Sequence, residues 1–255
     1  MIKFSPANAK TKHLMDYPNL AEWLDGGRKW YSLDLVAGYS CPFAEACLAK
    51  VKIVEGRRKV VDGPKQKFRC FSASQEATYT NVYNLRMGNF NALRGLSAWD
   101  MFTILKDNLP ANAGIVRPGV DGDFFSPVYF ESWLRLAYHR PDVLFYAYTK
   151  SLPYWVKYLE FIPDNFVLTA SYGGRRDDLI AKHNLRSATV VGSLEEANKL
   201  GLDIDHDDSH AADPTMRNQS FALLIHGIQP ANTKFAKAKQ ALKGVGSYGR
   251  GLVGV

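Results

Sequence analysis

The feature that most constrains the fold is an alternation of strand-like and helix-like segments along most of the chain. Short apolar runs rich in β-branched and aromatic residues recur between segments with helical periodicity. The alternation predicts strands at 29–36, 114–121, 143–149, 165–170, 188–192 and 220–226, and helices at 74–109, 126–138, 153–161, 176–183, 194–200 and 231–243. Gly88 and Gly95 are expected to divide the first helical segment. Six strands, each followed by a helix, predict an α/β fold with a parallel sheet. A doubly wound sheet and a partial barrel would show the same pattern.

The chain is expected to form a single α/β domain over residues 1–255. Its 255 residues are 46% hydrophobic and 22% charged, a composition that supports one ordinary core. Residues 1–28 would form an N-terminal extension and residues 244–255 a flexible, glycine-rich tail. The chain has neither an apolar run of roughly 20 residues nor the start of a signal peptide. We therefore expect a reducing intracellular compartment, in which cysteines stay free.

All three cysteines of the chain, Cys41, Cys47 and Cys70, fall in the region that follows the first predicted strand. An odd number of cysteines cannot form a complete disulfide framework, and soft thiolates suit an iron–sulfur cluster or zinc. Three thiolates on a four-iron cluster leave one iron open, whereas three thiolates and a histidine would close a zinc site. The spacing C-x5-C, with the third cysteine after 22 further residues, is wider than short zinc knuckles. The alternative is that some of them, Cys70 above all, are small core residues.

Polar loops follow several of the predicted strands. In parallel α/β folds such loops meet at the carboxyl ends of the strands, where ligands bind. Asp121, Gly122 and Asp123 follow the second strand, Lys150 the third and Ser171 the fourth. These five residues are the candidate cofactor-binding residues, although ordinary surface turns are also polar.

A second cluster of ligand-type residues lies at 203–210, in the run Asp-Ile-Asp-His-Asp-Asp-Ser-His. Two histidines and four carboxylates within eight residues suit a metal site or acid–base chemistry. A solvated acidic loop would have the same composition. His206, His210 and the isolated His13 are the candidates for a fourth ligand beside the cysteines.

The net charge of +7 and the isoelectric point near 9.2 favour anionic partners. Basic residues gather at 57–59, at 175–176 and in a series of four lysines near the C-terminus, Lys234, Lys237, Lys239 and Lys243. The chain contains no known nucleic-acid-binding motif, so binding of nucleic acid is an expectation from charge alone.

Several motifs together resemble a family of bacteriophage proteins with a cysteine-bearing N-terminal loop. They are Asn-Ala-Lys at 8–10, Ala-Gly-Tyr-Ser-Cys-Pro at 37–42, Asp-Gly-Pro at 62–64, Phe-Arg-Cys at 68–70, Gly-Asp-Phe-Phe-Ser at 122–126, Phe-Tyr-Ala-Tyr-Thr-Lys-Ser at 145–151, Val-Leu-Thr-Ala-Ser at 167–171 and Asp-His-Asp-Asp-Ser-His at 205–210. The resemblance covers nearly the whole chain. It implies a viral protein that works in the cytoplasm of a bacterial host.

The order of elements also resembles, more distantly, the radical S-adenosylmethionine enzymes. Their (βα)6 partial TIM-like barrel carries a cluster-binding cysteine loop after the first strand and a glycine- and acid-containing loop after the second. Here the cysteines follow the first predicted strand, and Gly122 and Asp123 follow the second. The resemblance implies a partial barrel, a [4Fe-4S] cluster and S-adenosylmethionine as cofactor. The compact C-x3-C-x2-C motif of those enzymes is absent, and Cys41, Cys47 and Cys70 would replace it.

Three functional hypotheses follow. The first is a phage iron–sulfur protein that binds a [4Fe-4S] cluster through the three cysteines. The second is a radical-type enzyme that uses this cluster to cleave S-adenosylmethionine. The third is a zinc-stabilised module that binds nucleic acid or another partner.

Overall fold

The computed structural model describes residues 1–8 and 11–242, so the expected tail at 244–255 lies outside the described residues. The strands are β1 (Ser5–Pro6), β2 (Lys29–Leu33), β3 (Ala49–Val54), β4 (Arg57–Asp62), β5 (Ala113–Pro118), β6 (Leu144–Thr149), β7 (Phe166–Ser171), β8 (Ser187–Val191) and β9 (Phe221–Leu224). The α-helices are α1 (Ala21–Leu24), α2 (Phe71–Thr78), α3 (Thr80–Leu93), α4 (Ala98–Asn108), α5 (Pro127–His139), α6 (Leu152–Lys157), α7 (Asp178–Lys182), α8 (Leu194–Lys199), α9 (Ser209–Ala212) and α10 (Lys234–Ala241). Short 3-10 turns are η1 (Thr11–Asp16), η2 (Pro18–Leu20), η3 (Asp25–Gly27), η4 (Leu159–Phe161) and η5 (Pro214–Met216).

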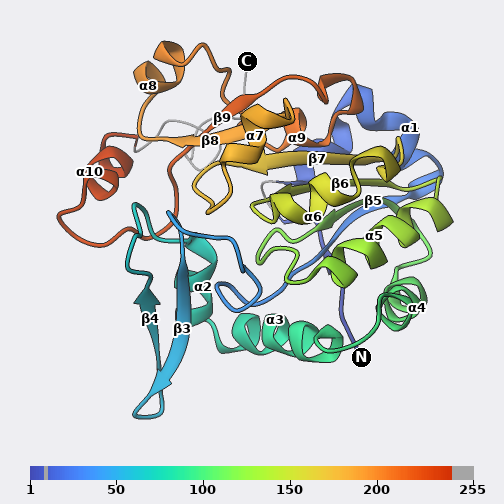
Figure 1. The fold of residues 1–255 in the computed structure, drawn as a ribbon, viewed down its shortest axis with the longest axis horizontal. Helices are drawn as coiled ribbons and strands as arrows, with labels where there is room; N and C mark the ends of the chain where they lie inside the picture. The colour runs from blue at the N-terminus through green and yellow to red at the C-terminus, as the bar shows by residue number, and fades with distance from the viewer. Residues whose placement is uncertain (9–10, 243–255) are drawn as a thin grey trace.

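The centre of the molecule is a mostly parallel sheet of seven strands in the order β1-β2-β5-β6-β7-β8-β9 (Figure 1). The six predicted strands are all present and pair in parallel in chain order. β1 adds one antiparallel strand at the edge beside β2. A doubly wound sheet reverses its strand order at a switch point, and this order does not reverse. Within the described residues the sheet does not close into a barrel.

The helical segment predicted at 74–109 consists of three helices and begins earlier, at Phe71. Tyr79, with extended backbone angles, separates α2 from α3. Gly95, at φ 82°, lies in the turn between α3 and α4, as expected. The expectation that Gly88 also breaks the segment is wrong, because Gly88 lies inside α3. A glycine costs a helix only about 1 kcal/mol, which the packing of the surrounding helix readily outweighs.

Two elements were not anticipated from the sequence. The basic stretch near residue 57 is one strand of a hairpin, β3–β4, rather than a turn. The end of the Asp/His-rich segment forms the short helix α9 instead of continuing as a loop. The other predicted boundaries shift by only a few residues.

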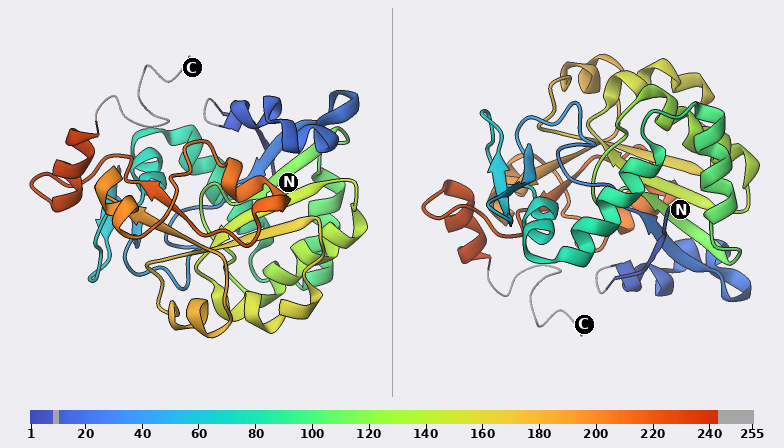
Figure 2. Two further views of the ribbon diagram at one scale, coloured as in Figure 1. Left: turned by 90° about the horizontal axis from the view of Figure 1, so that it is seen from above. Right: turned by 90° about the horizontal axis from the view of Figure 1, so that it is seen from below.

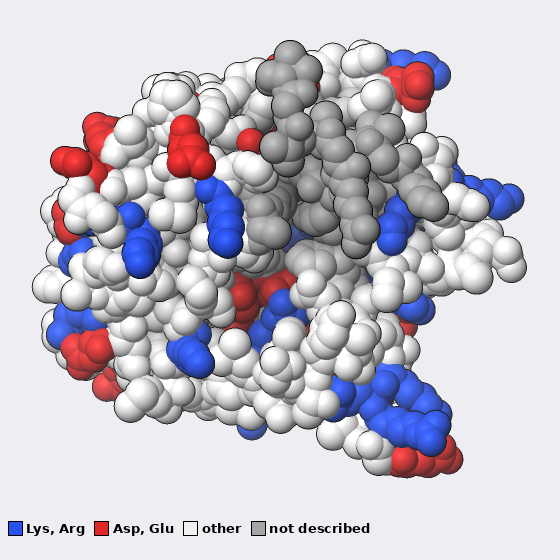
Figure 3. Space-filling view, turned by 180° about the vertical axis from the view of Figure 1, so that it is seen from behind, with Lys and Arg blue, Asp and Glu red and all other residues white. Residues whose placement is uncertain are grey.

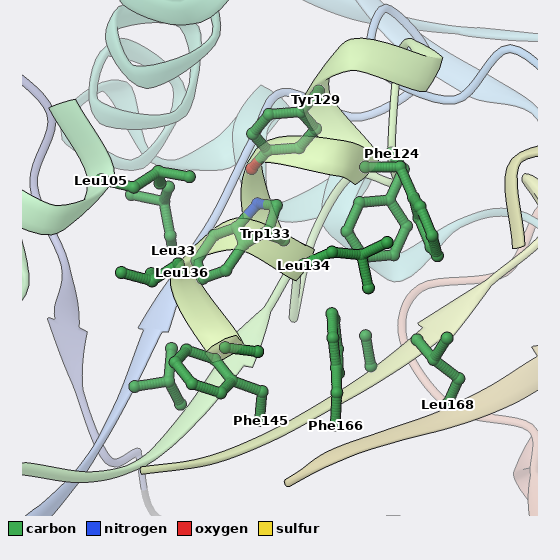
Figure 4. Close-up of a cluster of buried hydrophobic side chains, with 14 of the residues drawn as sticks. Leu33, Leu105, Phe124, Tyr129, Trp133, Leu134, Leu136, Phe145, Phe166 and Leu168 are labelled. Atoms are coloured by element: carbon green, nitrogen blue, oxygen red, sulfur yellow. The ribbon is translucent and has the colours of Figure 1, made fainter. Parts of the chain in front are cut away.

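The two faces of the sheet are covered differently, because successive side chains of a strand point to opposite faces. One face carries side chains such as Phe145 and Phe166, and it packs against α4, α5, α6 and α7 through residues including Leu105, Trp133 and Trp155 (Figure 4). Burial of each large apolar side chain stabilises the fold by about 1.5–3 kcal/mol. Figure 2 shows α5, α6 and α7 (yellow-green to orange) along one side of the sheet and the N-terminal turns (blue) on the other.

The opposite face is covered by segments from the two ends of the chain. Leu14 and Leu20 from the N-terminal turns and Ala211 and Ala212 from α9 pack on it. The first residues also enter the helix-covered core, through Ile2 and Phe4. The segment at 1–28, expected as an extension, is therefore part of both hydrophobic cores.

Candidate functional site

A large cavity, of about 1330 Å³, opens at the carboxyl ends of the parallel strands. Its wall includes Asp34 after β2, Asp121 after β5, Lys150 after β6 and Ser171 at the end of β7. Figure 3 shows a hollow near the middle of one face, with acidic and basic atoms at its bottom. The cavity lies where parallel α/β folds bind their ligands, as the sequence predicts.

The three cysteines come together in the wall of this cavity. Cys41 lies in the loop after β2, Cys47 just before β3, and Cys70 directly before α2. All three are free thiols and are partly buried. Cys41 and Cys70, which are 29 positions apart in the sequence, thus line the same cavity. A ligand site shared by the three cysteines requires such an arrangement.

Three glycines of the strand-end loops hold the cysteine loop in place. A Cβ on Gly122 would lie 2.6 Å from Oγ of Ser40, and one on Gly173 would lie 2.8 Å from Cβ of Ala46. A Cβ on Gly227 would lie 2.5 Å from Cβ of Phe71. All three glycines have positive φ angles, at 85°, 96° and 73°. Ser40, Ala46 and Phe71 are the chain neighbours of Cys41, Cys47 and Cys70. Each of them packs against the glycine of a different strand-end loop, where no side chain would fit.

Backbone hydrogen bonds support the same contacts. The Ala46 amide donates to the Gly173 carbonyl at 2.8 Å, and the Arg175 amide donates to the Phe43 carbonyl at 2.9 Å. At the other end of the loop, the Arg69 amide donates to Oε1 of Gln229 at 2.8 Å. The loop that carries Cys41 and Cys47 is thus joined to the end of β7, and the segment before Cys70 to the loop after β9.

The environment of Cys41 and Cys70 favours the neutral form of these two thiols. Burial raises the pKa of Cys41 well above its ordinary value, with a further rise from the Asp123 carboxylate and from Cys70. Burial and the neighbouring Cys47 raise the pKa of Cys70 to about 11. A metal would have to displace their protons, because thiolates and not thiols are the ligands.

No group of three or more Cys, His, Asp or Glu side chains in the described parts of the chain is arranged to hold a metal ion. The three thiols therefore share a cavity wall without forming a closed tetrahedral set. This arrangement differs from that of a structural zinc site, which needs four ligands in contact with the ion.

The candidate residues after β5 and β6 line the cavity but are already engaged by the protein. Arg86 and the hydroxyl of Ser72 both donate to the Asp121 carboxylate. The hydroxyl of Thr149 donates to Asp123 at 2.6 Å, and the backbone amide of Lys150 donates to it at 2.8 Å. These two carboxylates shape the site rather than offering free ligand oxygens.

Lys150 and Ser171 form a pair at the rim. The Lys150 ammonium donates to Oγ of Ser171 at 2.5 Å and to its carbonyl at 3.2 Å. Lys150 is 8% exposed, so its charge lies inside the cavity wall rather than in solvent. The pair can present a positive charge and a hydroxyl to a bound ligand.

The three candidate histidines differ in position. His13 and His206 line the cavity, whereas His210 does not. Nδ1 of His210 lies 3.8 Å from Oδ1 of Asp205, and this interaction raises the pKa of His210. Its ring packs on Phe221 at 5.5 Å. His210 is therefore part of the interior rather than of the cavity.

His226 also lines the cavity, and its ring packs against Phe71, the residue after Cys70, at 4.9 Å. It is the last residue of the strand predicted at 220–226 and was not singled out as a ligand. Its position two residues after the end of β9, the last parallel strand, is the signal that could have identified it.

A buried charged cluster in the wall of the cavity was not expected from the sequence. Arg86 in α3 binds Asp121 and also lies 3.3 Å from Glu76 in α2. Burial raises the pKa of Glu76 to about 7, and burial with the neighbouring Asp121 raises the pKa of Asp34 to about 6. Helical periodicity in α2 and α3 gave no sign of it, because the partners come from distant parts of the chain.

A second buried arginine, Arg117 at the end of β5, connects the sheet to the Asp/His-rich segment. Its guanidinium binds Asp208 and lies 4.7 Å from the ring centre of Tyr148 and 5.7 Å from that of Tyr146. Burial opposes the charge of Arg117 and is the largest single effect on its pKa, but Asp208, Tyr146, Tyr148 and Asp34 together outweigh it and raise the pKa. Asp208 has a left-handed backbone, at φ 73°, which aspartate tolerates better than most residues.

Comparison with known proteins agrees with the phage resemblance. The model of a family described as Gene product 88 matches residues 3–242, and the chain belongs to this family. Similar proteins include the Gene 88 protein of Mycobacterium phage L5, 30% identical over 122 residues, and that of Mycobacterium phage D29, 29% identical over 122 residues. Each alignment covers 44% of this chain, and it spans 44% and 43% of the two relatives. No solved structure matches significantly. Within residues 1–8 and 11–242, every helix is too short or too polar to cross a bilayer.

Proposed function

We propose that this phage protein binds a [4Fe-4S] cluster through Cys41, Cys47 and Cys70 and that it acts in the cytoplasm of the host bacterium. The observation that carries the proposal is the convergence of all three thiols on one cavity wall, each beside a residue that packs on a different strand-end loop. Soft thiolates are the usual ligands of iron–sulfur clusters, and three of them leave one iron open to a further ligand. His13, His206 and His226 line the same cavity and are candidates for the fourth position.

The preference for a cluster over zinc rests on the wide spacing of the three cysteines in the sequence. A structural zinc site needs four protein ligands and a cluster needs three thiolates, and no group of three or more such side chains in the described residues is arranged around one ion. Binding of a cluster would therefore bring the three thiols closer together. When bound, the cluster would supply electron transfer or an open iron for a ligand. The buried Lys150 and its partly exposed partner Ser171 would orient an anionic group of that ligand.

We further propose that the sheet is a (βα)6 partial barrel, related in arrangement to that of the radical S-adenosylmethionine enzymes. In support, the six parallel strands run in chain order without reversal, and the cysteine loop follows the first of them. Barrel sheets have this sequential order, whereas doubly wound sheets do not.

A second candidate function, cleavage of S-adenosylmethionine, is favoured by the size of the cavity. About 1330 Å³ exceeds the 300–1,000 Å³ typical of small-molecule sites, so a nucleoside-sized molecule would fit beside a cluster. The test is release of 5′-deoxyadenosine from S-adenosylmethionine by the reduced, reconstituted protein. If none is released while the cluster stays intact, the protein has an electron-transfer or structural role instead.

The decisive experiment for the cluster is anaerobic reconstitution with iron and sulfide, followed by metal and sulfide analysis. We expect a brown protein with equal iron and sulfide contents and broad absorption near ~400 nm, from thiolate-to-iron charge transfer. Cys41→Ala, Cys47→Ala and Cys70→Ala should each lose most of the iron. The variants His13→Ala, His206→Ala and His226→Ala test which histidine takes the fourth position. His210→Ala is their matched control, because His210 lies outside the cavity. A colourless protein with stoichiometric zinc would contradict the proposal.

A further inference from the structure

The hairpin β3–β4 projects from the body of the molecule and presents a basic face (Figures 1 and 3). Its register places Lys52 opposite Lys59, Val54 opposite Arg57, and Lys50 opposite Val61. Side chains of paired residues share a face, as do those two positions apart in a strand. One face of the hairpin therefore carries four basic residues, Lys50, Lys52, Arg57 and Lys59, which we call the basic face.

The basic face is unfavourable for the isolated protein. Like charges directly opposite each other in an antiparallel pair destabilise it, and Lys52 and Lys59 are such a pair. The acidic residue at the turn, Glu55, reaches Lys59 only at 3.8 Å, and both side chains are largely exposed. Such exposed pairs contribute little. A surface charge arrangement that works against folding indicates selection for something other than stability.

The hairpin is held rigidly despite this repulsion. The residues of its two-residue turn, Glu55 and Gly56, both have positive φ angles, at 52° and 73°, as the tight turns of twisted hairpins require. Toward its base, the Tyr39 hydroxyl donates to the Val51 carbonyl at 3.1 Å, and nearer the turn Nε of Arg58 donates to the Glu76 carbonyl of α2 at 2.9 Å. A rigid arm loses little conformational freedom on binding.

The Tyr39 ring adds a second contact to the basic face. The Lys50 ammonium lies 5.3 Å from its ring centre, within the range of a cation–π interaction. This contact holds Lys50 at the base of the hairpin, while Lys52, Arg57 and Lys59 remain exposed farther out. The three exposed cations are therefore available to a partner.

The helix α10 lies at the same end of the molecule as the hairpin in Figures 1 and 2. It exposes Lys234, Lys237 and Lys239 and packs through Phe235 against Phe68, at 5.5 Å between ring centres. Lys243, the fourth residue of this lysine series, lies outside the described residues. The positive charge at this end thus comes from two separate elements.

We propose that the basic face binds double-stranded DNA, with the hairpin placed in or along the major groove. A two-stranded β-ribbon fits the B-form major groove, whereas the deep, narrow major groove of A-form RNA does not admit side chains for readout. Lysine is depleted at the centres of protein–protein interfaces, and this face is centred on a lysine pair. Duplex phosphates complement such a charge pattern without requiring an apolar contact. This inference is independent of the proposed iron–sulfur site.

The test is a titration of a fluorescein-labelled, random-sequence DNA duplex with the full-length chain. Fluorescence anisotropy of the duplex reports binding, and the titration is repeated at several salt concentrations. Three phosphate contacts predict an affinity that falls about fortyfold between ~50 and ~200 mM salt. Lys52→Ala/Lys59→Ala should weaken binding about tenfold at low salt and reduce the slope of log affinity against log salt by about two. The matched control is Lys182→Ala/Lys199→Ala, which removes two exposed lysines from α7 and α8 and should leave the slope unchanged.

Folding of the hairpin variant is checked by thermal unfolding, where we expect an unchanged or higher midpoint because a like-charge pair is removed. Absence of duplex binding by the wild type, or equal losses in the hairpin and control variants, would overturn the proposal. Tighter binding of single-stranded RNA or of an acidic peptide than of the duplex would also overturn it, and would assign the face to that partner.

Discussion

The cysteine region and the Asp/His-rich segment at 203–210 both carry ligand-type residues to the same cavity, but the protein holds their side chains to different degrees. Asp205, His206 and Asp208 line this cavity together with Cys41, Cys47 and Cys70. Asp208 pairs with Arg117 and Asp205 accepts from Tyr148 at 3.1 Å, whereas the sulfur of Cys41 makes a long contact, at 3.9 Å, to Oγ of Ser40. A ligand-type residue therefore indicates a metal site less strongly where ion pairs and short hydrogen bonds already engage it.

The largest expected effect is the loss of Asp208. Asp208→Ala removes the ion-pair partner of Arg117, whose side chain is only 11% exposed, and we expect a loss of about 3–5 kcal/mol in the free energy of unfolding. The neighbouring Asp207→Ala is the control, because it removes only an acceptor of the Ser209 amide and should cost about 1 kcal/mol. Chemical denaturation of both variants measures the difference. Equal effects would mean that the segment is not held by the Arg117 pair.

The next effect concerns the pH dependence of stability in the metal-free protein. The pKa of Glu76 is raised to about 7 from 4.5, so the folded state holds a proton that the unfolded state has lost between these values. Stability should therefore decrease as pH rises from about 4.5 to about 7, by at most about 3.5 kcal/mol, since a tenfold change in a protonation equilibrium corresponds to about 1.4 kcal/mol.

Glu76→Gln should flatten this part of the stability profile, because the amide does not titrate. Denaturation of the wild type and the variant at a series of pH values checks it. A variant whose profile keeps the wild-type slope would show that another group, such as Asp34, causes the dependence.

A smaller effect is expected at the glycine contacts of the cysteine region. Gly122→Ala places a Cβ 2.6 Å from Ser40 and 2.8 Å from Leu35, in a backbone at φ 85°. We expect a cost of about 2–3 kcal/mol and lower iron retention, because the substitution displaces the segment that carries Cys41. Gly95→Ala is the control, since Gly95 has a similar φ of 82° and nothing within 4 Å. It should cost about 1 kcal/mol, the backbone strain alone. Similar values for both variants would show that contact with Ser40 does not hold the loop.

The smallest stability effect is expected for the cysteines themselves. In the metal-free protein, Cys41→Ala, Cys47→Ala and Cys70→Ala should each change the free energy of unfolding by less than about 1.5 kcal/mol, because the side chains are small and partly buried. Thermal or chemical denaturation under reducing conditions measures this. A loss comparable to that of Asp208→Ala would identify the cysteines as core residues and weaken the metal interpretation.

Much of the fold could be predicted because its signals are local. The apolar runs that form β5 to β9 and the polar, glycine-containing loops after them were visible in the sequence. The hairpin β3–β4 was missed because its strands are rich in lysine and arginine and are mostly exposed, which conceals their alternation. The break at Gly88 was predicted wrongly because a local propensity is weaker than the packing of a whole helix.

The candidate site could be predicted only in part, for a physical reason. Its residue types and their places after the strands were readable, and the cysteines, Lys150 and Ser171 do share one cavity. The partners of Asp121 and Asp123 were not readable, because Arg86 and Thr149 are brought to them by packing of distant elements. The same holds for His226, whose place beside Phe71 depends on two segments more than a hundred positions apart.

By itself, the sequence determined the α/β class, the six strands and their order along the chain, the polar loops that follow them and the grouping of all three cysteines after the first strand. Hydrophobic periodicity and turn chemistry act over a few residues, so these features can be read from the chain directly. Only the tertiary structure decided that the strands run in one direction across the sheet, that Gly122, Gly173 and Gly227 hold the cysteine region, and that the carboxylates at 205 and 208 are internal partners. These outcomes depend on contacts between residues far apart in the chain, whose charges and shapes become complementary only once the whole core has packed.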